Sequence, residues 1–256
     1  MMSEATDTDA CYAQEAKREA EMEVSSWRIL LKIGGLAGIL AGVLFRRNFA
    51  AELSLFGNIM PPSDALGWFT LLQENGILGV ILLDILDIID YLLVGLLFLA
   101  LYFPLRKEYQ GNMLIAITTA FIGIATSISS NIAFSMLSLS EHYVNATTDA
   151  QRSLLLAAGE AVLAISSSTG YYTGFVLLAI ACLIVSVTML RCMIFGKPIA
   201  IAGIMASVCD FLYCTTILLG MEIGVLFVSA AGLLLMIWHI VVGYRLVRMS
   251  QNERRR

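Results

Sequence analysis

The sequence predicts an all-α membrane protein, a polytopic bundle of six transmembrane helices with both termini in the cytoplasm and one short extracytoplasmic helix. Of the 256 residues, 59% are hydrophobic and only 14% are charged, whereas soluble domains carry about a quarter charged residues. The mean hydropathy is +0.82. Most of the chain must therefore meet lipid or other membrane helices, and the lipid bilayer is its first expected partner. No basic stripe is present, so we expect no nucleic-acid partner.

Six apolar runs are long enough to cross a bilayer, which requires about 20 mainly apolar residues in a helix. Pro104 is expected to end the second run, and Pro198 to open the fifth, where a missing amide hydrogen does no harm. Together the runs define a membrane domain over residues 28–248, between an acidic tail (1–27) and a basic tail (249–256). The runs lie at residues 29–45, 77–103, 112–137, 171–190, 199–219 and 223–245.

The basic residues predict the orientation, because Lys and Arg concentrate in the cytoplasmic loops of membrane proteins. With six crossings and the N-terminus inside, 13 of the 16 Lys and Arg residues face the cytoplasm, and only Arg46, Arg47 and Arg152 lie outside. A seventh crossing through residues 154–165 would leave 6 inside and 10 outside, and that short run contains Glu160. The expected location is therefore the cell membrane, with six passes and both ends in the cytoplasm.

Residues 149–166 are instead expected to form a helix at the outer surface. Thr148 and Gln151 have the spacing of a capping box for its start. Apolar residues then recur at helical spacing and would form the side that packs against the rest of the protein. This expected stripe consists of Leu154, Ala158, Ala161 and Ile165.

Three aspartates interrupt the second apolar run, and they are the strongest functional signal in the chain. Asp84, Asp87 and Asp90 are three residues apart, which places all three carboxylates on one side of a helix. A charge near the bilayer centre costs at least about 2.5 kcal/mol on insertion scales, so such residues usually face a bundle interior or a water-filled cavity. We expect this acidic face to point inward and not toward lipid.

The third run offers polar partners for these aspartates. A short loop joins the second and third runs, so they should be antiparallel neighbours, with Asn131 at the level of Asp84. Asp210, near the middle of the fifth run, is expected in the same polar region, with Tyr91 and Tyr213 within reach. The predicted intramembrane polar centre consists of Asp84, Asp87, Asp90, Asp210, Ser127, Ser130 and Asn131.

Three functions fit this centre, and the first is favoured. It is a small transporter, channel-like or accessory protein whose substrate is a proton, a cation or a small molecule. The second is an intramembrane enzyme with paired carboxylates. The aspartate spacing resembles the metal motifs of prenyl- and phosphatidyl-transferases, but their neighbouring Asn, Arg and Gly residues and second acidic motif are absent. The third is a non-catalytic sensor or scaffold, in which hydrogen-bonded aspartates set the helix register. No catalytic residue, metal ligand or cofactor is assigned.

Other patterns have structural explanations that are at least as good. Gly34, Gly38 and Gly42 form overlapping GxxxG units, which favour close helix packing within the chain or in a homo-oligomer. His239 is a candidate proton relay, although a lone histidine in such a helix is more often a packing residue. The chain has 2 histidines, too few for a multi-histidine metal centre. Asn145 begins a glycosylation sequon in an expected external loop.

Three segments of the chain also carry a family resemblance. They are residues 35–40, residues 141–161 and residues 171–203, the last including Met189-Leu190-Arg191 and Phe195-Gly196-Lys197. These segments resemble the prokaryotic integral membrane proteins grouped as domain of unknown function 4386, and the resemblance covers roughly residues 28–248. It implies a multi-span architecture and transfers no active-site residues.

Overall fold

The computed structural model describes residues 27–44, 61–166, 169–192 and 194–252. The predicted acidic tail up to residue 26, the pair Arg46 and Arg47, and the last four residues of the basic tail lie outside these ranges. Within the described ranges the chain folds into helices and contains no strand. The all-α prediction is therefore confirmed.

The helices have the following bounds in chain order. They are Trp27–Leu44, α2 (Ala65–Glu74), α3 (Gly76–Leu82), α4 (Ile85–Ser129), α5 (Ala133–Val144), α6 (Asp149–Ser166), α7 (Thr169–Cys192), α8 (Lys197–Leu218) and α9 (Gly224–Asn252).

Six helical stretches are long and apolar enough to cross a membrane, which is the predicted number. Pro198 lies in the first turn of α8, as predicted. Two of the stretches continue beyond the length of a bilayer, with 37 and 44 residues, or about 55 and 66 Å at 1.5 Å per residue against a hydrocarbon thickness of about 30 Å. The six stretches are Trp27–Leu44, Ile85–Arg106, Glu108–Val144, Asp149–Cys192, Lys197–Leu218 and Gly224–Asn252.

The second and third predicted runs form one antiparallel hairpin within α4. Its backbone leaves helical geometry at Tyr109 (φ −134°, ψ 44°), and Gly95 lies against Phe121 and Ile124 across the hairpin. The prediction that Pro104 ends the second run is wrong, because the helix passes through Pro104 and turns at Tyr109. Proline removes only one backbone hydrogen bond. Because Pro104 lies near the end of the helix, the loss of that bond does not prevent the last turn from forming.

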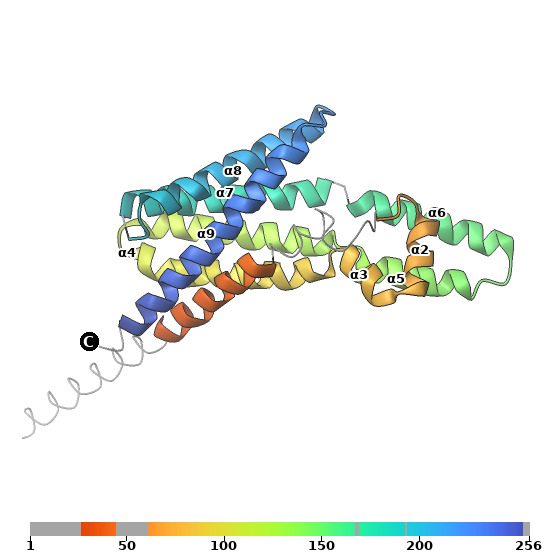
Figure 1. Ribbon diagram of the computed structural model, residues 1–256, viewed down its shortest axis with the longest axis horizontal. Helices are drawn as coiled ribbons and strands as arrows, with labels where there is room; N and C mark the ends of the chain where they lie inside the picture. The colour runs from red at the N-terminus through yellow and green to blue at the C-terminus, as the bar shows by residue number, and fades with distance from the viewer. Residues whose placement is uncertain (1–26, 45–60, 167–168, 193, 253–256) are drawn as a thin grey trace, which may run out of the picture.

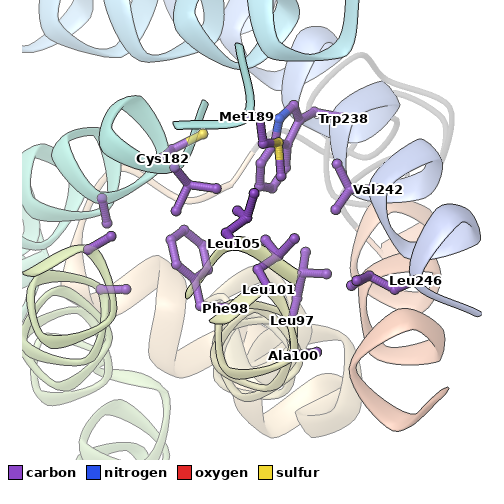
Figure 2. Close-up of a cluster of buried hydrophobic side chains, with 14 of the residues drawn as sticks. Leu97, Phe98, Ala100, Leu101, Leu105, Cys182, Met189, Trp238, Val242 and Leu246 are labelled. Carbon is purple, nitrogen blue, oxygen red and sulfur yellow. The ribbon is translucent and has the colours of Figure 1, made fainter. Parts of the chain in front are cut away.

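The bundle is built around one apolar core. α4 packs on α7, α7 on α8 and α8 on α9, while the N-terminal helix Trp27–Leu44 lies against α4 and α9 (Figure 1). Figure 2 shows the side chains that fill the space between these helices. The largest of those that are fully buried include Leu97, Leu101, Leu105, Met113, Met189, Trp238 and Leu246.

Four helices form a separate layer beyond one end of the bundle. α2, α3, α5 and α6 lie together there, at the opposite end of the molecule from the first turn of the N-terminal helix and the last turn of α9 (Figure 1). This layer has a second apolar core, in which α2 supplies Trp68, Phe69 and Leu72 and α5 supplies Met136. We call these four helices the cap layer. Its presence explains why two stretches exceed the bilayer thickness.

α6 matches the predicted helix over residues 149–166 but packs through a different side. One half of the capping box is present, since the Gln151 backbone amide donates to Thr148 Oγ1 at 3.2 Å, whereas the Gln151 side-chain oxygen accepts from the Thr147 amide at 3.1 Å. The predicted apolar stripe is wrong, because Leu154 is 71% exposed and Ile165 is 48% exposed. The packed side carries Gly159, which is in contact with α2 through its Ala65 and Phe69 side chains, and with it Leu156, Val162 and Leu163.

Glu160 of α6 has a specific role in this layer. Its Oε1 accepts a hydrogen bond of 2.7 Å from the backbone amide of Ala65, the first residue of α2. A carboxylate is favourable at this position because the N-terminus of a helix carries unpaired amides and a partial positive charge. Glu160, whose charge is one reason not to expect a seventh crossing, therefore links α6 to α2 through a hydrogen bond.

Candidate functional site

The second predicted run is interrupted at its aspartates. α3 ends at Leu82, and α4 begins at Ile85, with Asp84 between them in the left-handed region (φ 61°, ψ 31°). This conformation is uncommon for a residue other than glycine, and aspartate tolerates it better than most. The expectation of one helical face with three carboxylates is therefore corrected, because Asp84 precedes the helix and Asp87 lies in its first turn.

The third predicted run is interrupted at the same level. α4 ends at Ser129, and α5 begins at Ala133. The Asn131 side chain joins the two interruptions, since its Nδ2 donates to the backbone carbonyl of Asp84 at 2.9 Å and to that of Leu83 at 3.4 Å. Its Oδ1 accepts from the Ala133 amide at 3.1 Å. The predicted level of Asn131 beside Asp84 is confirmed. The Asn131 side-chain amide forms hydrogen bonds with backbone groups at both interruptions.

A polar cavity of about 190 Å³ lies where these interruptions meet. We call it the junction cavity, because its wall comes from the bundle and from the cap layer. α4 contributes from both of its ends, α6 contributes its last turn, and α7 contributes its first turns. The lining residues are Trp68, Leu82, Leu83, Asp84, Asp87, Tyr91, Ser127, Ser130, Asn131, Ile132, Leu163, Ser166 and Tyr171.

Most of the predicted polar centre lines this cavity. Asp84, Asp87, Ser127, Ser130 and Asn131 all do so, together with Tyr91. Sequence reasoning missed the contributions of Ser166, Tyr171 and Trp68. The run of small polar residues from Ser166 to Gly170 was a usable signal, since it marks the interval between α6 and α7.

Asp90 lies below the cavity, on the side of α4 that faces the bundle core. It is 8% exposed, and Val94 and Leu97, which follow it at helical spacing, belong to the core. Its Oδ1 has no hydrogen-bond partner among the described residues. A buried polar atom without a partner therefore lies at this end of the α4 hairpin, where water or a ligand could satisfy it.

Ser127 is enclosed by a close contact between α4 and α7. Gly174 of α7 faces it, and a Cβ added at Gly174 would collide with Ser127 Oγ. A Cβ added at Gly123, one turn earlier on α4, would lie 3.1 Å from the Gly174 carbonyl oxygen. These two glycines allow the backbones of α4 and α7 to approach closely beside Ser127, which lines the cavity.

Two other predicted site residues lie elsewhere. Asp210 is buried on α8 at 6% exposure, but α8 packs on α7 and α9, and Asp210 does not line the junction cavity. The expectation that it joins the same polar region is therefore corrected. Tyr213 also lies outside the lining, with its ring 6.0 Å from that of Phe175. Because α7 lies between α4 and α8, residues of α8 such as Asp210 are separated from the α4 side of the cavity.

His239 makes contacts typical of a packing residue. It is 6% exposed, and its Nδ1 lies 2.8 Å from the Leu235 carbonyl oxygen of the same helix. Its ring meets Trp238 edge-on at 5.3 Å between centroids. His239 is not among the residues that line the junction cavity, and its relay role stays a hypothesis.

The glycines of the N-terminal helix serve intramolecular packing. Gly34 lies against Ala100 of α4, and Gly42 lies against Met236 and Ile240 of α9. Gly38 lies between Leu97 of α4 and the His239 carbonyl of α9. The predicted role of these glycines in helix packing is therefore confirmed, and the helices that they pack against are α4 and α9 of the same chain.

A pair of glycines that the GxxxG pattern does not include makes a direct contact between the backbones of the N-terminal helix and α9. A Cβ added at Gly243 of α9 would lie 2.5 Å from the Gly35 carbonyl oxygen, and one added at Gly35 would lie 2.7 Å from that of Gly243. The two backbones therefore touch at this crossing. The spacing of glycines within the N-terminal helix does not by itself reveal that Gly243 of α9 lies opposite Gly35.

Fold and cavity together define the class of the protein. It is a polytopic α-helical membrane protein in which a polar cavity separates a six-span bundle from a helical cap layer. Comparison with protein-family models, curated proteins and solved structures gives no match. Membership of domain of unknown function 4386 therefore stays a prediction. The residues that the structure describes contain no group of three or more His, Cys, Asp or Glu side chains that could hold a metal ion.

Proposed function

We propose that this protein is a small transporter of the cell membrane and that the junction cavity is its outer binding site. The observation that carries the proposal is that two interrupted helices meet at one cavity. Interrupted helices hold substrates and ions in transporters because the unwound backbone exposes carbonyl and amide groups. Non-helical backbone at membrane depth is tolerated where it is buried or lines a water-filled cavity.

The lining favours a small ligand that donates hydrogen bonds. Carboxylates, hydroxyls and an amide line the cavity together with several apolar side chains. Its volume of about 190 Å³ is below the range of roughly 300–1,000 Å³ for drug-sized ligands. Tyr91 and Tyr171 add aromatic faces, which attract cations. A cation, a hydrated proton or a small amine fits this chemistry better than a lipid or a large anion.

The apolar core supports a closed inner side. Between the cavity and the opposite end of the bundle lie the packed side chains of Figure 2, including Leu101, Leu105 and Met189 at 0–1% exposure. Passage of a ligand would require these helices to move apart, as in alternating-access transporters. This arrangement corresponds to a state that is accessible only from the cap side.

The orientation belongs to the same proposal, with the cap layer outside the cell. We expect single cysteines at Ser63 and Asn145 to react with a membrane-impermeant maleimide in intact cells, whereas cysteines at Glu108 and Asn252 should react only after lysis. All four positions are exposed, and the native cysteines would first be replaced. Labelling of residue 252 in intact cells would refute the six-span topology.

Ligand binding can be tested by thermal unfolding of the purified protein with sodium, magnesium, choline and spermidine as probes. A ligand present at 100 times its Kd stabilises a protein by about 2.7 kcal/mol, or roughly 5–11 °C in Tm for a chain of this size. We expect at least one probe to produce such a shift. Asp87→Asn should remove most of it, because this carboxylate lines the cavity.

Asp149→Asn is the matched control, since it makes the same chemical change at a fully exposed site at the far end of α6. It should leave the ligand-induced shift unchanged. Ser127→Ala is a second cavity variant with little effect on charge, and it should weaken binding more mildly. Equal shifts in the parent protein and both cavity variants would contradict a ligand site in the junction cavity, while binding without transport would favour a sensor.

A further inference from the structure

A second, larger cavity lies at the opposite end of the bundle. Its volume is about 410 Å³, and it is formed by the first turns of the N-terminal helix and the last turns of α9. Gly35 and Gly243 hold the two helices together nearby, and the cavity begins just beyond that crossing. Its lining residues are Arg28, Ile29, Lys32, Val247, Ser250 and Gln251.

The cavity combines two positive charges with polar groups. Arg28 and Lys32 lie one helical turn apart on the same side of the N-terminal helix. Neither forms an ion pair with any residue in the described part of the chain. Gln251 of α9 adds an amide that can donate hydrogen bonds. A phosphate group matches this set, because arginine and lysine both bind phosphate oxygens with charge-assisted hydrogen bonds.

An apolar stripe leads from the cavity along the outer face of the N-terminal helix. It starts at Ile29, which lines the cavity and is 55% exposed. The remaining members recur at intervals of three and four residues, so the stripe follows one side of the helix. They are Ile33, Leu36, Leu40 and Val43, all exposed.

We propose that this cavity binds the headgroup of an anionic phospholipid, with the phosphate between Arg28 and Lys32 and the acyl chains along the apolar stripe. Basic cavities between transmembrane helices are a recurring way to bind anionic lipid headgroups. The stripe selects a lipid over free phosphate, because only a lipid places hydrocarbon next to Ile29 and Ile33. This inference is independent of the proposed transport function.

Such a lipid would join the N-terminal helix to α9. These helices already meet at the Gly35–Gly243 crossing, where their backbones are in contact and the Val247 side chain of α9 lies against Gly35. A headgroup held by Arg28 and Lys32 against Gln251 would close the gap beyond that crossing. The bound lipid should therefore stabilise the docking of the N-terminal helix.

Affinity for dioctanoyl phosphatidylglycerol, measured by thermophoresis in neutral detergent, tests the proposal. The double variant Arg28→Gln, Lys32→Gln should bind roughly 30-fold more weakly, since each basic residue near an anionic surface contributes roughly fivefold. Arg28→Lys, which keeps the charge, should stay within about threefold of the parent protein. The lipid should also raise the Tm of the parent protein and not that of the double variant.

Three controls separate this site from general attraction. The double variant Arg191→Gln, Lys197→Gln removes two exposed charges near the α7–α8 turn, outside the cavity, and should bind like the parent protein. Dioctanoyl phosphatidylcholine and inorganic phosphate should each bind far more weakly than phosphatidylglycerol. Equal loss in both double variants, equal binding of phosphatidylcholine, or equal stabilisation by phosphate alone would each overturn the proposal.

Discussion

Replacing Gly243 by leucine should lower the stability of the protein more than any other single change considered. The added side chain would start 2.5 Å from the Gly35 carbonyl oxygen and 2.8 Å from the Ile39 amide nitrogen, both of them backbone atoms. Overpacking in a core costs typically 1–3 kcal/mol, and rigid backbone on the opposite side places this variant at the upper end. We expect Tm to fall by roughly 6–12 °C, as measured by tryptophan fluorescence in detergent.

Gly111→Leu is the matched control for this change. Gly111 also lies in a helix, but a Cβ at this position would have nothing within 4 Å. Leucine has a higher helix propensity than glycine, so Tm should stay level or rise slightly. Gly243→Ala should give a smaller decrease than Gly243→Leu. If the Gly243 and Gly111 variants lose equal stability, close contact between the N-terminal helix and α9 is not what requires Gly243.

Asp90→Leu should stabilise the protein and abolish the proposed transport activity. Asp90 extends the apolar side of α4 that continues through Val94 and Leu97, yet its Oδ1 lacks a hydrogen-bond partner in the described structure. A buried polar group without a partner costs about 1–3 kcal/mol, so leucine should raise Tm by roughly 2–12 °C. The same substitution removes a buried carboxyl group next in sequence to Tyr91, which lines the junction cavity.

Proton-coupled flux in proteoliposomes, followed with a pH-sensitive dye, provides the second measurement for Asp90. Asp90→Asn should fold normally and lose flux, because it keeps the shape and removes the titratable group. Asp149→Asn serves as the control and should retain both stability and flux. A lower Tm for Asp90→Leu would show that the carboxyl makes a stabilising interaction. Undiminished flux in Asp90→Asn would remove Asp90 from the transport mechanism.

Together these two predictions distinguish a residue that contributes only to stability from a residue that is required for the proposed activity. Gly243 acts through backbone contact far from the junction cavity, so its effect should appear in stability whatever the ligand is. Asp90 lies within an otherwise apolar stripe and its Oδ1 has no hydrogen-bond partner in the described structure, so its carboxyl group should cost stability. Residues that are costly to a fold are typical of functional sites, where stability and activity compete.

The sequence by itself determined the fold class and the number of helices that are long and apolar enough to cross a membrane. Hydrophobicity over a window of about 20 residues is a local property, so all six spans are visible in the chain without any knowledge of their neighbours. The capping box at Thr148 and Gln151 is local for the same reason. The level of Asn131 beside Asp84 followed from helical rise and a short connecting loop.

The tertiary structure decided where the spans are interrupted. A helix can break inside an apolar run only if another segment satisfies the freed backbone groups. Here the partner is the Asn131 amide, 47 residues from the Asp84 carbonyl that it binds. Periodicity alone favoured a continuous helix over residues 77–103, because it contains no information about a partner so distant in the chain.

Packing partners also decided which sides of the helices meet. α6 has apolar residues on more than one side, and the contact of Gly159 with Ala65 and Phe69 selected the buried one. Asp210 has the expected burial, but the order of α4, α7 and α8 places it away from the cavity. Depth along a helix follows from counting residues, whereas lateral neighbours depend on how whole helices pack. This is the physical reason why the spans and part of the cavity lining could be predicted from the sequence, whereas the contributions of α2, α6 and α7 to that lining could not.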